Sequence, residues 1–333
     1  MKLTTPLSAL LEIEVPLFNA PMTPQAGGAL ARAVGDAGAF GMLGFDEDES
    51  EADIAGQVEL LREGRDRAFG IGLAAWVLER RPQLLEIAIA ARPRLVSISF
   101  GNPAPFVAAL HANGILVASQ VQSRAWAQTA LDADVDILVA QGTEAGGHTG
   151  SVGTLPLLQF VLEMTDRPVV AAGGIATGRG FAAVLAAGAA GAWIGTPFLL
   201  ARESRSNARA RERLIASDET QTIYTHVYDA VQGKPWPAEF AGRALRNPFA
   251  ERWHAREDEL LRSPQALEEF ARAKASQDYS RANIYAGQSV GAIREVRGAA
   301  EIVADFERGA TARLRECATL LIEDRPAPPR LGG

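Results

Sequence analysis

The fold is decided by the stretch Pro168-Val-Val-Ala-Ala-Gly-Gly-Ile-Ala-Thr-Gly-Arg-Gly-Phe-Ala-Ala-Val-Leu-Ala-Ala-Gly-Ala-Ala-Gly-Ala-Trp-Ile-Gly-Thr196. Two short apolar runs, residues 168–172 and 191–194, enclose a segment of helical composition and spacing, residues 179–187. Each apolar run ends in a glycine-bearing turn. Continuous apolar strands that alternate with helices are typical of a parallel sheet that is buried on both faces.

The same alternation extends towards the N-terminus. Six more apolar runs are predicted as strands, at residues 16–19, 39–43, 68–73, 95–100, 114–119 and 135–140. Helical segments are predicted at residues 27–36, 82–91, 103–112, 123–132 and 155–163. Eight successive strand–helix units are what a closed (β/α)₈ barrel, the TIM barrel, requires. We therefore predict an α/β fold of this type.

A doubly wound nucleotide-binding fold is the structural alternative. That fold needs the motif Gly-x-Gly-x-x-Gly directly after its first strand. Here the first strand continues into Ala20-Pro-Met-Thr-Pro24, and two prolines are incompatible with such a glycine turn. The glycine-rich turns follow the seventh and eighth strands instead, which favours the barrel.

The alternation stops after Gly195. Residues 203–214 and 258–276 are predicted helices around an irregular, aromatic-rich stretch at residues 224–253. We interpret residues 201–287 as a small helical lobe inserted after strand eight, and residues 1–200 and 288–333 as the barrel. A final helix at residues 301–323 would close the outer ring. In the short arm at residues 233–237, Trp236 is interpreted as an anchor of the lobe on the barrel.

Composition limits the classes of function. The chain has 333 residues, of which 47% are hydrophobic, and a net charge of −7 that disfavours nucleic acid as a partner. No apolar run reaches the roughly 18 residues of a membrane helix, and the N-terminus has no signal-peptide pattern, so we expect a cytoplasmic protein. The acidic run at residues 46–53 is interpreted as a solvated helix start. The oligomeric state stays open, with a homodimer among the options.

Two glycine loops predict a phosphate site. Barrel enzymes carry their active sites at the carboxyl ends of the strands, and residues 172–178 and Gly195-Thr196 follow strands seven and eight. The N–H groups of Gly173, Gly174, Gly195 and Thr196 can converge there on phosphate oxygens. The pattern indicates a phosphate without identifying the molecule that carries it.

The loop after strand six, Gln141-Gly-Thr-Glu-Ala-Gly-Gly-His-Thr-Gly150, predicts the chemistry. Gly146 and Gly147 allow the backbone to lie flat against a planar ligand, and His148 offers an imidazole for proton transfer. Glu144 could orient that imidazole or cap the following helix. The other three histidines are interpreted as structural or solvent-exposed: His111, His226 and His254.

Weaker candidates complete the site. In the first loop, Ala20, Pro21 and Met22 could bracket a heterocyclic ring, and either Gln120 or Gln122 could bind a ring or a ribityl chain. No His and carboxylate spacing predicts a metal site. The single cysteine, Cys317, lies in the predicted last helix, which argues against a cysteine nucleophile.

These motifs resemble the nitronate monooxygenase family, formerly called 2-nitropropane dioxygenases, which are FMN-dependent barrel enzymes. The resemblance runs through residues 19–22, 141–150, 171–180 and 195–199, and includes Tyr285-Ala-Gly-Gln288. Many relatives differ at two points, with Asn where this chain has Gly72-Leu73 and Arg where it has Pro197.

The resemblance implies an FMN cofactor held by the first-loop backbone, with its phosphate on the glycine loops and His148 as the catalytic base. The implied reaction oxidises nitronates or nitroalkanes with O₂ to a carbonyl compound and nitrite. The alternative is an NAD(P)H-dependent FMN reductase of an enoyl thioester, because enoyl-acyl-carrier-protein reductases have a similar barrel and histidine loop. A barrel that binds a sugar phosphate or stores flavin without redox turnover is a third hypothesis.

Overall fold

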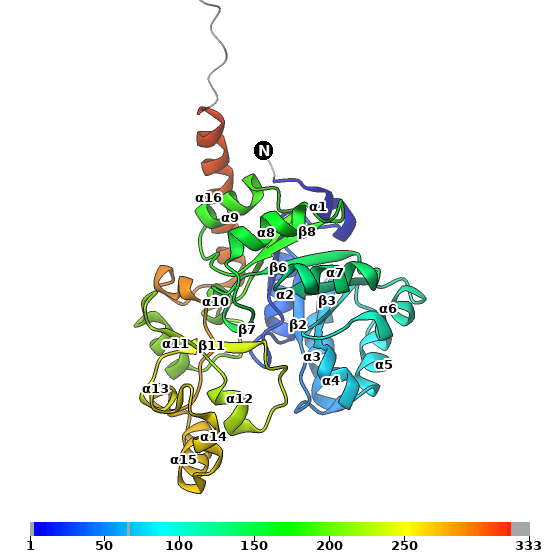
Figure 1. The fold of residues 1–333 in the computed structure, drawn as a ribbon. Coiled ribbons are helices and arrows are strands. Elements are labelled where there is room, and N and C mark those ends of the chain that lie inside the picture. The colour runs from blue at the N-terminus through cyan, green and yellow to red at the C-terminus, as the bar shows by residue number, and fades with distance from the viewer. Residues whose placement is uncertain (1–2, 65–66, 321–333) are drawn as a thin grey trace, which may run out of the picture.

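The barrel prediction is confirmed. The computed structural model describes residues 3–64 and 67–320, and within them eight parallel strands form a nearly closed barrel with helices outside it (Figure 1). The strand order around the sheet is β1-β9-β8-β6-β5-β4-β3-β2. The strands are β1 (Leu17–Asn19), β2 (Gly41–Gly44), β3 (Phe69–Ala74), β4 (Leu95–Ser99), β5 (Leu116–Val121), β6 (Ile137–Gln141), β8 (Val169–Ala172) and β9 (Gly191–Ile194).

The six helices that the sequence predicts between the strands are observed, with each end shifted by at most one residue. They are α2 (Gly28–Asp36), α5 (Gln83–Ala90), α6 (Ala104–His111), α7 (Arg124–Asp132), α8 (Thr154–Leu162) and α9 (Gly178–Ala186). The outer ring also contains α3 (Glu51–Arg62) and α4 (Ala75–Arg80), for which no range was predicted. The acidic run does lead into a helix, because the Ser50 side chain accepts a hydrogen bond from the Asp53 N–H at the start of α3.

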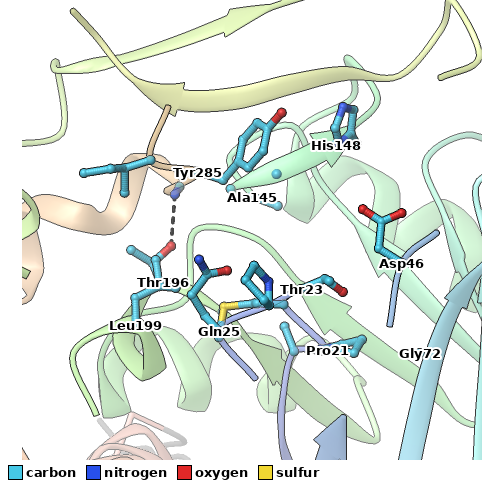
Figure 2. Close-up of a pocket in the computed structure, with 18 of the residues that line it drawn as sticks. Pro21, Thr23, Gln25, Asp46, Gly72, Ala145, His148, Thr196, Leu199 and Tyr285 are labelled. Carbon is cyan, nitrogen blue, oxygen red and sulfur yellow. Dashed lines mark hydrogen bonds between the residues drawn. The ribbon is translucent and has the colours of Figure 1, made fainter. Parts of the chain in front are cut away.

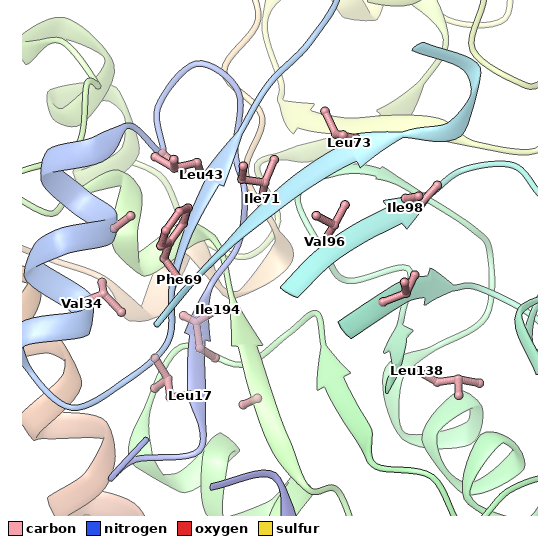
Figure 3. Close-up of a cluster of buried hydrophobic side chains, with 14 of the residues drawn as sticks. Leu17, Val34, Leu43, Phe69, Ile71, Leu73, Val96, Ile98, Leu138 and Ile194 are labelled. Carbon is pink, nitrogen blue, oxygen red and sulfur yellow. The ribbon is translucent and has the colours of Figure 1, made fainter. Parts of the chain in front are cut away.

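Alternation along the strands divides the core into two layers. Leu17 and Ile194 point outward to the helices, whereas Phe18 and Trp193, one position away, point into the barrel. Figure 3 shows part of the outer layer, with Val34 of α2 in the same cluster as strand side chains. Helix α1 (Pro6–Leu11) contributes two leucines to the inner cluster. The filled interior leaves the carboxyl ends of the strands as the place for a site.

The seam between β1 and β2 is closed by a side chain. Only the isolated bridge between Phe18 and Phe40 links these strands among the described residues. Buried Asn19 completes the joint: its Oδ1 accepts from the Met42 N–H at 2.9 Å, and its Nδ2 donates to the Met42 carbonyl at 2.8 Å. The Asn19 side-chain amide thus takes the place of backbone hydrogen bonds between β1 and β2.

We expect Asn19→Ala to lower the free energy of unfolding by about 2–4 kcal/mol, because it leaves a buried N–H and a buried carbonyl of Met42 unpaired. Urea denaturation would measure the change. Asn113→Ala is the control, since the Asn113 side chain is exposed and should change stability by less than about 0.5 kcal/mol. A loss below about 1 kcal/mol for Asn19→Ala would contradict the role of the amide.

The lobe after strand eight is mainly helical, as predicted, and two strands are added to its helices. Residues 201–287 contain α11 (Ala208–Ile215), α12 (Val227–Gln232), α13 (Pro248–Trp253), α14 (Glu257–Leu261) and α15 (Pro264–Ser276). The short helix α10 (Thr196–Leu199) precedes them, and the 3₁₀ turn η1 (Gln288–Ala292) follows them. The lobe also contains β10 (Thr222–Thr225) and β11 (Ala241–Leu245), which pair in an antiparallel sheet with β7 (Gly147–Thr149). The lobe is therefore joined to the barrel through the pairing of β11 with β7. Its predicted limits at residues 201 and 287 remain a prediction.

Two predicted helices differ from those observed, for local reasons. The helix predicted at residues 203–214 begins only at Ala208, because the Asn207 side chain caps it. The helix predicted at residues 258–276 is split into α14 and α15, because Pro264 cannot continue α14 and instead begins α15 after Ser263. The last helix is α16 (Ala299–Ala318), and residues 321–323 of the prediction lie outside the described residues. Within the described residues, every helix is too short or too polar to cross a lipid bilayer.

Candidate active site

One large cavity lies at the carboxyl ends of the strands, between the barrel and the lobe (Figure 2). Its volume is about 730 Å³. Eleven of the residues that the sequence suggested for the site line it: Ala20, Pro21, Met22, Gln120, Gly146, Gly147, His148, Gly173, Gly174, Gly195 and Thr196. Gln122, the alternative to Gln120, does not line it. The topology thus brings residues at or beyond the carboxyl ends of five barrel strands to one place.

The two glycine loops present unpaired donors to the cavity. Gly173 and Gly174 have φ angles of +101° and +70°, which an L side chain rarely adopts. Among the described residues, the N–H groups of Gly173, Gly174, Gly195 and Thr196 donate to no other group. The Thr196 hydroxyl oxygen accepts a hydrogen bond from the Gly287 N–H at 2.9 Å (Figure 2). An anionic group is the kind of ligand that such N–H groups bind.

The first loop forms a wall through its backbone. The Ala20 N–H donates to the Ile194 carbonyl, which holds the loop against β9. A Cβ atom at Gly72 would lie 2.3 Å from Cγ of Pro21, so no side chain fits at Gly72 while the Pro21 ring lies there. The first loop and β3 are therefore closely packed at Gly72.

The structure separates the two candidate glutamines. Gln120 lines the cavity, and its side-chain amide makes no hydrogen bond within the described part of the chain. Gln122 is buried away from the cavity: its Nε2 donates to Oε1 of Gln141 at 2.8 Å, and Gln141 Nε2 donates to the His148 carbonyl at 3.1 Å. Gln122 and Gln141 therefore fix the backbone at His148, and Gln120 is the glutamine available to a ligand.

His148 lies in strand β7 rather than in a loop, and Gly242 of β11 is its partner in the ladder. Its Nε2 lies 2.7 Å from Oδ1 of Asp229, at the start of α12 in the lobe. Both side chains are nearly buried, with 6% and 9% exposed. Nδ1 makes no hydrogen bond to any described residue. A neutral imidazole that donates Nε2–H to the carboxylate carries its lone pair on Nδ1, which is the arrangement of a proton acceptor.

Glu144 caps the helix that follows and does not orient the imidazole of His148. Its carboxylate accepts from the Thr154 N–H at 2.9 Å and from the Thr154 hydroxyl at 2.8 Å, at the first turn of α8. It makes no hydrogen bond to His148. The carboxylate that orients the imidazole is Asp229, 81 residues further along the chain.

Trp236 does more than anchor the lobe. Its ring stacks on the His148 ring with centroids 3.4 Å apart and planes within 5°, and its edges meet Phe100 and Trp76. The arm that carries it is tied down by Lys234, whose Nζ lies 2.5 Å from Asp46 and 3.0 Å from Asp48. Burial would lower the pKa of Lys234, but the two aspartates outweigh it and raise that pKa. The lobe thus closes over the imidazole with an aromatic wall and an ion pair.

Tyr285 forms another wall and comes from the segment before η1. Its ring centroid lies 5.5 Å from that of His148 (Figure 2). Burial, together with the charge of Asp229, raises the pKa of the phenol well above its ordinary value. Tyr285 therefore remains a neutral donor across the physiological pH range.

Among the described residues, no three His, Cys, Asp or Glu side chains converge as a metal site would require.

Sequence reasoning missed Asp229, and it gave Trp236 only the role of an anchor and not its place against His148. The only local signal was an aspartate and a tryptophan within an aromatic-rich, irregular stretch. Nothing in that spacing shows that the segment returns to the sixth strand. The contact becomes visible only when β11 pairs with β7.

A barrel with such a cavity at its strand ends has the architecture of an enzyme, and comparison with known proteins gives the class, a flavin-dependent oxidoreductase. The model of one family, described as nitronate monooxygenase, matches residues 79–308. The chain belongs to the nitronate monooxygenase family.

Individual relatives differ in the activity that they are named for. The nitronate monooxygenase of Neurospora crassa is 30% identical, over 90% of both chains. A (3aS,4S,5R,7aS)-5-hydroxy-7a-methyl-1-oxo-octahydro-1H-indene-4-carboxyl-CoA dehydrogenase of Rhodococcus jostii is 31% identical over 69% of this chain and 64% of its own. This chain spans only 60–65% of the length of three of its curated relatives, one of which is this Rhodococcus dehydrogenase.

Solved structures resemble the whole chain. FabK from Thermotoga maritima has a TM-score of 0.83 at 28% identity, and covers 96% of this chain and 100% of its own. The nitroalkane oxidase of Streptomyces ansochromogenes has a TM-score of 0.77 at 26% identity, and covers 95% and 99%. The lobe is therefore present in these structures together with the barrel.

Proposed function

We propose that this protein uses FMN to oxidise alkyl nitronates and neutral nitroalkanes with O₂, giving a carbonyl compound and nitrite, with His148 as the base. The observation that carries the proposal is the buried pair of His148 and Asp229 at a cavity with four unpaired backbone donors. The names of the Neurospora monooxygenase and the Streptomyces oxidase support it.

The residues around the cavity fit FMN. Its phosphate would bind the N–H groups of Gly173, Gly174, Gly195 and Thr196, at the glycine loops after β8 and β9. The first loop and Gln120 would hold the ring system and the ribityl chain. When bound, the flavin supplies a two-electron acceptor that amino-acid side chains lack.

His148 would act on the substrate carbon. Nδ1 accepts the α-proton of a neutral nitroalkane, and the resulting imidazolium is stabilised by Asp229 and holds the nitronate anion. A preformed nitronate arrives without that proton. Neutral nitroalkanes therefore depend more strongly on the base than nitronates do.

The aromatic wall would keep the proton transfer dry. Trp236 stacks on one side of His148, with Phe100 and Trp76 packed edge to face against Trp236, and Tyr285 closes another side. Exclusion of water strengthens the interaction of the imidazolium with both Asp229 and an anionic substrate.

Reduction of an enoyl thioester with NAD(P)H is the second candidate. The cavity extends beyond the barrel to Arg205 and Lys274, two cations that suit a phosphorylated arm. The name of the Rhodococcus CoA dehydrogenase supports this alternative. Both reactions would use the same flavin site and the same histidine.

Anaerobic flavin bleaching distinguishes the two candidates. The purified protein should absorb as a flavoprotein and release FMN on denaturation. We expect rapid bleaching by a nitronate, with nitrite formed once air is admitted, and no rapid bleaching by NADH or NADPH. Bleaching by a nicotinamide alone would favour the reductase, and a protein that takes up no flavin would contradict both.

We expect Gly174→Val to reduce the FMN content, because a branched side chain at a φ of +70° distorts the backbone donors of the phosphate loop. The flavin-to-protein absorbance ratio after gel filtration would measure retention, with about a tenfold weaker affinity expected. Gly114→Val is the matched control, since Gly114 has a φ of +69° but lies outside the cavity lining. Full flavin occupancy in Gly174→Val would argue against this phosphate site.

A further inference from the structure

Asp229 lies between two imidazoles. Oδ1 is 2.7 Å from Nε2 of His148, and Oδ2 is 3.6 Å from Nδ1 of His226. The His226 side chain is 41% exposed, whereas those of Asp229 and His148 are nearly buried. One carboxylate therefore connects the cavity to the solvent side of the lobe.

The backbone fixes this arrangement. His226 is the N-terminal cap of α12, and its carbonyl accepts from the Asp229 N–H at 3.1 Å and the Ala230 N–H at 3.0 Å. Oδ2 of Asp229 is buried and has no hydrogen-bond partner within the described part of the chain. A buried carboxylate oxygen without a donor is costly, and an N–H on Nδ1 of His226 would face this oxygen across 3.6 Å.

We infer that His226 is a positioning residue that acts through Asp229 and keeps His148 in its neutral, proton-accepting form. A single carboxylate compensates one positive charge well. A protonated His226 takes part of that compensation, which leaves less of it for a positive charge on His148. This role rests on the proposed function, because it matters only where His148 acts as a base.

The other ionisable groups near the pair do not replace His226. The charge of Asp229 acts on Tyr224 and Tyr285, and Tyr228 packs on Tyr285; burial raises the pKa of each phenol, so all three remain neutral. The charge of Asp46 is balanced by Lys234. Arg243, on the strand that pairs with β7, turns its guanidinium to Thr143 and lies in the field of Glu144. Of the ionisable groups named here, His226 is therefore the one that can place a positive charge opposite Oδ2 of Asp229.

Histidine NMR tests the coupling without any substrate. The chain has four histidines, so their ring resonances can be assigned by substitution. In the flavin-loaded protein, His226→Gln should move the titration midpoint of His148 upward by about 0.5–1 pH unit. His226→Lys, which restores a positive charge, should keep the midpoint at or below its wild-type value. His111→Gln breaks a separate pair with Asp136 and should leave it unchanged.

The acidic limb of the pH profile of kcat/KM with a neutral nitroalkane should follow the NMR midpoint in each variant. A wild-type His148 midpoint in His226→Gln would overturn the inference, as would an equal rise in His226→Lys. A rise of the His148 midpoint in His226→Gln but not in His226→Lys would support the coupling even if the protein oxidises no nitroalkane. A failure to oxidise nitroalkanes would overturn the proposed reaction and not the coupling.

Discussion

His148→Ala is expected to lower kcat/KM for neutral nitroalkanes by about 10²–10⁴-fold, the usual contribution of a general base. The same variant should keep its flavin, because the proposed phosphate donors lie on other loops, at Gly173 and Thr196. A preformed nitronate has already lost its α-proton, so its oxidation should fall much less. The contrast between the two substrates is the signature of a base.

Steady-state nitrite release from matched nitroalkane and nitronate substrates would measure this contrast. His254→Ala is the control for removal of an imidazole elsewhere, since His254 is exposed, contacts Thr225 and lies outside the cavity lining. If nitroalkane turnover is unchanged in His148→Ala, His148 is not the base. If both substrates lose activity equally and the flavin is also lost, the residue has a structural role instead.

The barrel could be predicted because its signals are local. Each strand is a short apolar run, and the strands that end at residues 141, 172 and 194 are followed by glycine-bearing turns. The closure of a (β/α)₈ barrel then brings all carboxyl ends to one face, so residues at or beyond the carboxyl ends of five strands could be assigned to one site before any contact was known. Gly173 and Gly174 illustrate this, since their positive φ angles explain why only glycine suits the turn.

The lobe could not be predicted in the same way, because its contacts are long-range. His148 and Asp229 are 81 residues apart, and the two segments meet through a short antiparallel sheet whose strands lack a clear alternating pattern. Glu144, only four residues from His148, was the nearer candidate in sequence, but the geometry of α8 uses its carboxylate for Thr154. Proximity in sequence is a poor guide when a carboxylate serves a helix terminus.

Asp229→Asn is expected to lower kcat/KM for neutral nitroalkanes by about 10²-fold or more, although asparagine keeps the shape of the side chain. The carboxylate accepts Nε2–H of His148 and leaves the lone pair on Nδ1. An asparagine amide can donate to Nε2 instead, which transfers the ring proton to Nδ1 and removes the acceptor. The buried imidazolium also loses its counter-charge.

Single-turnover reduction of the flavin by a nitroalkane would measure the loss in Asp229→Asn, with Asp136→Asn as the control because it alters the distant pair with His111. Nitronate oxidation should again be affected less. The double variant with His226→Gln makes the test sharper, because His226 is inferred to act only through the Asp229 charge. In the Asp229→Asn background, His226→Gln should therefore leave the titration midpoint of His148 unchanged, and a further shift would show that His226 reaches His148 by another route.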